Sequence, residues 1–451
     1  MDRSPSPATT QAAPAGASTA GFAEASRGHD ASQGPAARPE VESLQAYSAP
    51  LEGRRGLLRL DFNENTVGPS PKVVAAIRAI PADHYAIYPE YDGLRQAVAA
   101  SLAATANGGA PASGVVGPAS GSEGPEEGAA AWLRPEQIGL FNGVDAALHA
   151  VFQAYGAPGE RLLTTSPTFG YYTPCARMQG MEIEAIPYRL PHFAFPLEEI
   201  RAALLGPADS TWQASSGAHP SDWRPPRLLL LCNPNNPTGT RLAPQRILEL
   251  AAAAPQTLVV VDELYEAFTG DSVLPLLLGS PGRRDPFAAV ANLLVLRSLS
   301  KTAGLAGLRI GFAIGSAALV DRVSRVTGPY DINSFAVTAA FAAMADQPYV
   351  DAYVAEVLRG RSWLVERLQR SGVRHHVAGG NYLLLWPERD PAAVERDLRA
   401  AGILVRSMAG KPLIDGSLRV SLGSLAQMER FWEAYLRVAD LSASAPPPDP
   451  H

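Results

Sequence analysis

Cysteine is nearly absent from this chain: its 451 residues include only Cys175 and Cys232. Two cysteines cannot form the disulfide framework of a small secreted domain, and their spacing matches no metal-binding motif, so we expect no metal site. So little cysteine also fits a reducing compartment, and we expect a cytoplasmic protein.

Long apolar runs and clusters of positive charge are missing as well. The longest aliphatic runs, such as LLLLC at 228–232, are far too short to cross a bilayer. The N-terminus lacks the charged start and apolar stretch of a secretory signal, and Glu24, Asp30 and Glu40 argue against a transit peptide. The net charge is −6 without any basic block, which argues against a nucleic-acid partner. We therefore expect no membrane and no nucleic acid as partner.

Stretches rich in Ala, Ser, Pro and Gly divide the chain. They have too few apolar residues to offset the entropy lost on ordering. We expect residues 1–44 and 441–451 to be disordered tails, and residues 103–130 and 206–226 to be flexible surface insertions. The remaining length is too great for one ordinary core and suffices for two domains.

Helix-like and strand-like patterns alternate between these stretches. Leu and Val runs without polar alternation, at 228–232 and 257–261, are typical of strands buried on both faces. The alternation predicts an α/β fold with a mostly parallel, helix-covered sheet in a large domain at 76–328. Helices are predicted at 73–80, 94–104, 145–156, 171–180 and 244–254, and strands at 137–141, 161–167, 181–188, 227–234, 257–264 and 292–300.

The pattern changes near residue 330. A long helical stretch at 336–371 precedes three strand-like segments, which predicts a smaller α+β domain at 329–440. We expect an N-terminal arm at 45–75 to contribute part of this smaller domain.

Side chains able to do chemistry follow five of the predicted strands. Open parallel sheets bind ligands beyond the carboxyl ends of their strands. The five segments are NPNNPTG with Asn236, DELY with Asp262 and Tyr265, SLSK with Ser298, Ser300 and Lys301, the glycine turn NGVD at 142–145, and PTFGYY with Phe169.

Each segment alone has a simple structural explanation. An acid after a strand is usually a cap, NPNNPTG is a good turn, and an aromatic residue is more often core. Together, however, they suit a single ligand. Such a ligand has an aldehyde for the lysine, a ring nitrogen for the carboxylate, a flat face for the aromatic residue and a phosphate for the helix N-terminus and hydroxyls. Pyridoxal 5′-phosphate has all of these groups.

Five motifs carry a family resemblance that extends from about residue 45 to 440. They are LDFNENTVGPSPKVVAAI, YPEYDGLRQAVA, CNPNNPTG, VVVDELYEAF and RSLSKTAGLAGLRIGF. This set resembles the fold-type I (class I/II) pyridoxal-phosphate-dependent aminotransferases, and most of all their histidinol-phosphate aminotransferase branch. The resemblance implies a three-layer sandwich, pyridoxal 5′-phosphate as cofactor, and transfer of an amino group to a 2-oxo acid.

The resemblance also implies roles around the cofactor ring. Lys301 would hold the cofactor as an internal Schiff base and later move the substrate proton, which needs a partly neutral amine. Asp262 would pair with the ring nitrogen so that the ring can absorb carbanion charge. Tyr265 and Asn236 would hydrogen-bond the ring oxygen, and Phe169 would stack on the ring.

The phosphate end would be held by side chains and by a helix N-terminus. Ser298, Ser300 and Arg309 would bind it directly, and the backbone amides of Val144 and Asp145 would add the helix dipole.

Tyr88 matches a family tyrosine that reaches the phosphate of the neighbouring subunit, which implies a homodimer. The alternative is a tyrosine packed in a turn before Pro89.

Three residues match substrate-binding positions of the same branch. Arg419 and Arg406 would bind the acidic groups of the substrates, and Tyr47 would cover them. Histidinol phosphate or glutamate is then the amino donor, and 2-oxoglutarate the acceptor.

Several departures leave the donor open. Thr66 and Val67 replace the usual proline and aromatic residue after NEN, so an aromatic or specialised amino acid stays plausible. Decarboxylation of a phosphorylated amino acid is the nearest rival reaction. A cofactor-binding regulator without turnover is disfavoured, because residues 1–44 show no helix-turn-helix pattern.

Overall fold

The computed structural model describes residues 35–45, 50–106, 133–206, 223–279 and 285–440. The chain forms two units, residues 1–43 and 44–451. In the first unit, helix α1 (Pro39–Glu42) forms where the sequence predicted no structure; the Glu42 carboxylate accepts a 2.6 Å hydrogen bond from the Ala37 amide. Residues 1–34 of the predicted N-terminal tail, the C-terminal tail at 441–451 and most of both predicted insertions lie outside the described residues.

The second unit contains a seven-stranded sheet in the order β2-β8-β7-β6-β5-β3-β4. Strand β8 runs antiparallel to both of its neighbours, while the other paired strands are parallel, so the predicted mostly parallel sheet is confirmed. The strands are β2 (Ile138–Phe141), β3 (Arg161–Ser166), β4 (Glu182–Pro187), β5 (Leu228–Cys232), β6 (Leu258–Asp262), β7 (Leu293–Ser298) and β8 (Gly311–Gly315).

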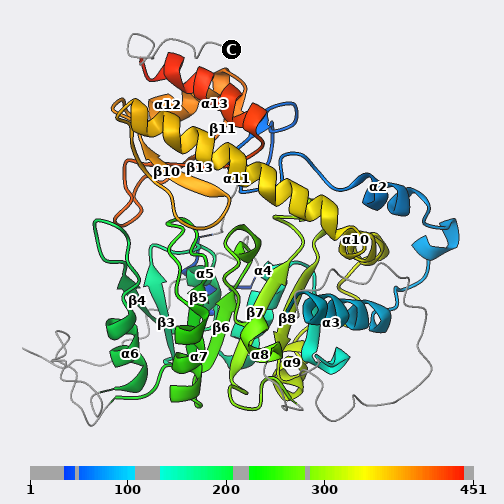
Figure 1. Cartoon of the computed structure of the whole chain (residues 1–451). Helices are drawn as coiled ribbons and strands as arrows, with labels where there is room; N and C mark the ends of the chain where they lie inside the picture. Colours follow the sequence, from blue (N-terminus) through cyan, green and yellow to red (C-terminus); the bar gives the residue numbers. More distant parts are fainter. Residues whose placement is uncertain (1–34, 46–49, 107–132, 207–222, 280–284, 441–451) are drawn as a thin grey trace, which may run out of the picture. The chain divides into compact units, whose positions relative to one another are not determined.

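Helices cover both faces of this sheet (Figure 1). Val259 and Val261 of β6 pack in the same apolar cluster as α7 and α8, whereas Val260 packs in the cluster of α4 and α5. Both faces of the sheet are thus buried against helices, which explains why the central strands lack polar alternation. The predicted three-layer sandwich is confirmed. These helices are α4 (Val144–Tyr155), α5 (Tyr172–Met178), α7 (Pro244–Ala253) and α8 (Leu274–Leu278).

The predicted helical stretch at 336–371 is two helices, α10 (Ser334–Met344) and α11 (Gln347–Arg370). Asp346 between them leaves the helical conformation, and its carboxylate accepts hydrogen bonds from Ser70 and from Lys72 Nζ. Other helices are α2 (Pro71–Arg78), α3 (Asp92–Ala106), α6 (Leu197–Leu205) and α9 (Ala317–Ser324), with 3₁₀ turns η2 (Ala82–Tyr85), η3 (Pro135–Gln137), η6 (Glu266–Phe268) and η7 (Ala306–Leu308).

A second, antiparallel sheet has the order β12-β13-β10-β9 and packs with α11, α12 and α13 in a separate apolar cluster. Strand β1 (Leu58–Arg59) pairs in parallel with β11 (Ile403–Leu404), which joins the N-terminal arm to these elements. The domain boundaries themselves stay predictions. The remaining elements are β9 (Arg374–His376), β10 (Tyr382–Trp386), β12 (Arg406–Ser407), β13 (Leu418–Ser421), α12 (Pro391–Ala400) and α13 (Leu425–Val438).

The two sheets meet through a backbone contact at the NPNNPTG turn. The amide of Gly379, just before β10, donates to the carbonyl of Gly239 at 2.7 Å. A Cβ at Gly379 would lie 2.7 Å from Pro234 Cβ, so only glycine allows this approach. The turn that carries Asn236 is therefore held both by β5 of the large sheet, which it follows, and by the segment before β10 of the second sheet. Among the described residues, no helix is both long and apolar enough to span a membrane.

Candidate active site

Asp262 is the last residue of β6 and is 3% exposed. Its carboxylate accepts hydrogen bonds from the Tyr172 hydroxyl at 2.6 Å and from the Leu264 amide at 3.2 Å. Burial raises the pKa of Asp262 to about 6, although these two donors oppose the rise. Both donors are neutral, so the buried carboxylate is well placed to receive a cationic N–H.

Lys301 follows β7 and is half-buried. Its Nζ donates to the carbonyl of Phe62 at 2.9 Å. Burial, together with the positive charge of Arg419, lowers the pKa of Lys301 to about 8. A substantial fraction of the amine is therefore neutral near physiological pH, which a nucleophile or a proton acceptor requires.

The Tyr265 hydroxyl lies between two asparagine side chains. Asn236 Nδ2 is 3.2 Å from the phenol oxygen and Asn63 Nδ2 is 3.1 Å from it. Asn236 is held in turn by Arg419, whose Nη1 donates to Asn236 Oδ1 at 2.7 Å. Burial raises the pKa of Tyr265, so the phenol stays protonated at neutral pH.

The predicted phosphate-binding residues come together at the start of α4. Ser298 Oγ lies 2.8 Å from Ser300 Oγ and 3.1 Å from the carbonyl of Ile310. Arg309, which directly precedes Ile310 in the chain, donates through Nη2 to Asp145 Oδ2 at 2.8 Å. Two hydroxyls, a guanidinium and a helix N-terminus beginning at Val144 suit one phosphate group.

Gly143 makes this arrangement possible. Its φ is +80°, and an added Cβ would lie 2.6 Å from Arg309 Nη2. Arg309 itself has a left-handed φ of +57°, which is uncommon for a residue with a side chain. The Arg309 guanidinium therefore occupies the place of the missing side chain, beside the first amides of α4.

Phe169 and Tyr88 have different surroundings. Phe169 is half-buried and packs edge-on against Tyr172, with ring centroids 5.4 Å apart, so it lies next to the partner of Asp262. Tyr88 is 68% exposed and stacks on Tyr330 at 3.9 Å.

The two predicted substrate arginines face each other. Arg406 and Arg419 are paired residues of β12 and β13. The Arg406 guanidinium lies 5.6 Å from the ring centroid of Phe62, whose carbonyl binds Lys301. The third predicted substrate residue, Tyr47, lies outside the described residues.

Sequence reasoning gave no role to Asn63 or Tyr172, yet both bond directly to predicted site residues. Asn63 lies in the LDFNEN motif and Tyr172 in the PTFGYY segment, so both motifs were recognised. Their bonding partners lie 202 and 90 residues away, and no local spacing indicates them.

Three observations fit pyridoxal 5′-phosphate. Lys301 has a depressed pKa, as an aldehyde-binding amine needs. Asp262 is a buried carboxylate with neutral donors, as a partner for a protonated ring nitrogen would be. Gly143 leaves room for a guanidinium at a helix N-terminus, as a phosphate requires. Among the described residues, no three His, Cys, Asp or Glu side chains form a cluster that could hold a metal ion.

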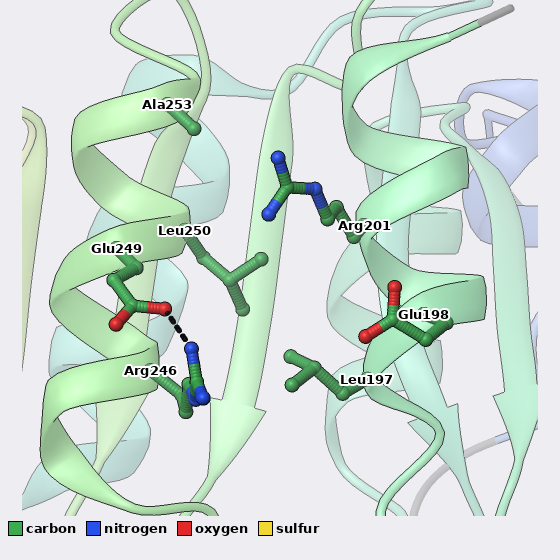
Figure 2. Close-up of a pocket in the computed structure, with 7 residues that line it drawn as sticks. All are labelled: Leu197, Glu198, Arg201, Arg246, Glu249, Leu250 and Ala253. Atoms are coloured by element: carbon green, nitrogen blue, oxygen red, sulfur yellow. Dashed lines mark hydrogen bonds and ion pairs between the residues drawn. The ribbon is translucent and has the colours of Figure 1, made fainter. Parts of the chain in front are cut away.

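A small pocket of about 110 Å³ lies away from these residues, between α6 and α7 (Figure 2). Arg246 and Glu249 in its wall bond to each other at 2.6 Å. It contains none of the predicted site residues, and we assign it no role. The lining residues are Leu197, Glu198, Arg201, Arg246, Glu249, Leu250 and Ala253.

Comparison with known proteins identifies relatives over nearly the whole described chain. The family model "Aminotransferase class I and II" matches residues 55–434. Histidinol-phosphate aminotransferase 1 of Bordetella parapertussis is 32% identical over 402 residues, covering 87% of this chain and 95% of that protein.

Solved structures share the fold at lower identity. Histidinol-phosphate aminotransferase from Sinorhizobium meliloti, solved in complex with pyridoxal-5′-phosphate, has a TM-score of 0.69 and 22% identity, covering 91% of this chain and 99% of that one. L-threonine-O-3-phosphate decarboxylase from Porphyromonas gingivalis has a TM-score of 0.62 and 22% identity, covering 85% and 100%. Because an aminotransferase and a decarboxylase both have this fold, the fold does not define the reaction.

Proposed function

The chain belongs to the aminotransferase class I and II family, and from that premise we propose that it transfers the amino group of histidinol phosphate to 2-oxoglutarate. The family depends on pyridoxal phosphate. When bound, this cofactor supplies an electron sink for the charge that develops when the substrate loses a proton.

We assign the following contacts to the cofactor. Lys301 binds the aldehyde end, Asp262 the ring nitrogen, Tyr265 and Asn236 the ring oxygen, and Phe169 the ring face. The phosphate is bound by Ser298, Ser300, Arg309 and the backbone amides of Val144 and Asp145. The support for this assignment is that these groups, which come from five separate segments, meet at the carboxyl edge of one sheet.

Lys301 is the group that takes and returns the substrate proton at Nζ. Its pKa of about 8 lets the amine both accept and release a proton near neutral pH. Asp262 keeps its negative charge next to the cation that it binds. A cation in hydrogen-bond contact lowers the pKa of a carboxyl group, which opposes the effect of burial on Asp262.

The pairing of Arg406 with Arg419 is the observation that carries the choice of substrate. The two cations lie opposite each other on adjacent strands, one beside Phe62 and the other bonded to Asn236. Histidinol phosphate has a phosphate and no carboxylate, whereas 2-oxoglutarate has two carboxylates. Two neighbouring guanidinium groups can bind either kind of anion in turn. In this proposal Tyr47 covers the bound substrate.

The active form in this proposal is a homodimer, to which Tyr88 of each subunit contributes a contact with the other subunit's cofactor phosphate. Its support is the exposure of Tyr88, 68%, in a chain whose other assigned cofactor-binding side chains are buried or half-buried.

A half-reaction screen tests the proposal. The protein loaded with pyridoxal phosphate is mixed with histidinol phosphate, glutamate, phenylalanine or tyrosine, and conversion of the bound cofactor to its amino form is followed by absorbance. We expect histidinol phosphate and glutamate to convert it fastest. Faster conversion by an aromatic amino acid would contradict the proposed donor. Release of carbon dioxide from a phosphorylated amino acid, without glutamate formation, would indicate the rival decarboxylase.

A substitution tests the arginine pair. Arg406→Gln is expected to raise KM for histidinol phosphate by about tenfold or more, because it removes a charge-assisted contact, with a smaller change in kcat. Arg374→Gln is the control, since Arg374 lies in the same sheet over Trp386 and touches none of the assigned residues. Equal effects of the two substitutions would contradict the role of Arg406.

A further inference from the structure

We propose that Asn63 is a positioning residue that fixes the direction in which Tyr265 donates its hydroxyl hydrogen. The inference rests on the proposed function, because the acceptor of that hydrogen is the ring oxygen of the cofactor. It assigns a role to a residue outside the set predicted from the sequence.

Asn63 has an unusual environment. Its side chain is fully buried, at 0% exposed, and its φ is +54°. A non-glycine residue in the left-handed region costs energy and persists only where the surroundings hold it. Three contacts hold Asn63. Its backbone N–H donates to Ser421 Oγ at 2.9 Å, and its backbone carbonyl accepts from Asn381 Nδ2 at 3.1 Å. Its side chain faces Tyr265.

Ser421 sets the orientation of the Asn63 side chain. Ser421 Oγ already accepts the backbone N–H of Asn63, so its own hydrogen is available to donate to Asn63 Oδ1 at 3.0 Å. The oxygen of the Asn63 side chain therefore faces Ser421. Its Nδ2, which can only donate, faces the Tyr265 oxygen at 3.1 Å.

Arg419 sets the orientation of the second amide in the same way. An arginine has no acceptor, so Asn236 Oδ1 must be the atom that receives Arg419 Nη1 at 2.7 Å. The Nδ2 of Asn236 then points to the Tyr265 oxygen at 3.2 Å. Asn236 cannot turn round without losing Arg419, and Asn63 in this orientation accepts from the Ser421 hydroxyl while its N–H faces the Tyr265 oxygen.

The Tyr265 oxygen thus accepts hydrogen bonds from two side-chain amides, those of Asn63 and Asn236. The phenol cannot donate to either of them, because both present N–H groups. Its hydrogen must point away from both amides, where it is available to a ligand. With one donor removed, the hydroxyl gains freedom to rotate, and its hydrogen bond to the ligand weakens. Asn63 therefore acts through Tyr265, and Ser421 acts through Asn63.

A double-mutant cycle tests this inference. Asn63→Gly removes the amide, keeps the backbone N–H that binds Ser421, and tolerates φ of +54°. The measurement is the pH titration of visible absorbance of the protein loaded with pyridoxal phosphate, made in the wild-type and Tyr265→Phe backgrounds. A donor to the ring oxygen stabilises its anionic form, so weakening the donor should raise the apparent pKa of the chromophore.

We expect Asn63→Gly to raise this pKa by about half to one unit, the equivalent of one ordinary hydrogen bond. In the Tyr265→Phe background the same substitution should cause no further rise. Equal shifts in both backgrounds, or no shift in the wild type, would overturn the inference. A wild-type protein that takes up no pyridoxal phosphate would overturn the proposed function and this inference together.

Ser421→Ala gives an independent test that leaves Asn63 in place. It should raise the chromophore pKa in the same direction, and Ser421→Thr, which keeps the hydroxyl, should not. Ser417→Ala is the matched control: Ser417 is also fully buried near β13, but its hydroxyl donates to Ile414 O at 2.6 Å. An equal shift with Ser417→Ala, or none with Ser421→Ala, would contradict the orienting role of Ser421.

Discussion

At the scale of single residues, burial shifts the pKa values of the two groups proposed to be catalytic in opposite directions. It raises the pKa of Asp262 to about 6 and lowers that of Lys301 to about 8. In both cases burial disfavours the charged form, so a protein without cofactor is less stable for having these groups. We expect this loss of stability to be measurable.

Lys301→Met should stabilise the cofactor-free protein. The pKa of Lys301 is lower in the folded protein than its ordinary value of 10.5. Below about pH 8 the amine is charged in both the folded and the unfolded protein, so the full cost of burying the charge lowers the free energy of unfolding. Stability then rises with pH between 8 and 10.5. We expect a gain of roughly 1–3 kcal/mol at pH 7, and none above pH 10.5, by urea unfolding.

Lys411→Met is the control for that measurement, because Lys411 is exposed. It should leave the pH dependence of stability unchanged. A Lys301→Met protein that is less stable than wild type at pH 7 would contradict the expected cost of burying this amine.

Asp262→Asn should reduce kcat by about a thousandfold while the protein still folds. The amide keeps the shape of the side chain but loses the charge that pairs with the ring nitrogen, and an ion pair at low dielectric is worth several kcal/mol. Steady-state kinetics would measure the loss. Asp271→Asn, which breaks only the contact with Arg241, should change kcat by less than about twofold. Near-normal turnover in Asp262→Asn would refute its role.

Part of the site could be predicted from local spacing. Asp262 and Lys301 each follow a recognisable apolar strand, so sequence alone indicates that they reach one sheet edge. Asn63 could not be assigned in this way. Its function depends on Tyr265 and Ser421, which are 202 and 358 residues away, and its own neighbours indicate only a turn.

At the scale of elements, prediction failed where a segment depends on tertiary contacts. Strand β8 is bounded by Gly311 and Gly315 and lacks the long apolar run of its neighbours, yet it pairs with two strands. Gly311 is needed there because a Cβ would lie 2.7 Å from the Val144 amide. The break at Asp346 likewise depends on its contacts with Ser70 and Lys72.

The start of α4 offers a test of the phosphate site with a closely matched control. Gly143 and Gly159 have φ of +80° and +77°, so alanine strains the backbone similarly at both. At Gly143 the new Cβ would meet Arg309 Nη2 at 2.6 Å; at Gly159 nothing lies within 4 Å.

We expect Gly143→Ala to weaken pyridoxal phosphate binding by about tenfold or more, and Gly159→Ala to leave it unchanged, by equilibrium titration of the cofactor-free protein. Equal affinities in the two variants would mean that Arg309 does not need the space beside Gly143.

At the scale of the whole molecule, several aromatic side chains of the described residues are exposed and stack on one another. Two stacked pairs, Tyr85 with Phe335 and Tyr88 with Tyr330, lie on segments that also expose Ile87. Exposed apolar side chains that gather in this way usually mark an interface. In the proposed homodimer, a second copy of the chain covers them.

Ile87→Glu should therefore convert the dimer to monomers and weaken cofactor binding, as measured by light scattering and cofactor titration. A buried, unpaired carboxylate is costly at any interface. Leu190→Glu is the control, since Leu190 is 58% exposed, close to the 61% of Ile87, and lies in a different segment. A dimer that survives Ile87→Glu, or dissociates equally in both variants, would place the interface elsewhere.

The segment from Asp61 to Thr66 has a consequence for the order of events during synthesis. Asp61 O and Asn63 bond to Arg419 and Ser421, 358 positions later, and Thr66 bonds to Gln427, 361 positions later. A nascent chain can complete all seven strands of the large sheet before these partners leave the ribosome. Chains that stop short of residue 419 are thus expected to fold in part yet retain no pyridoxal phosphate after gel filtration, so that bound cofactor marks a finished polypeptide.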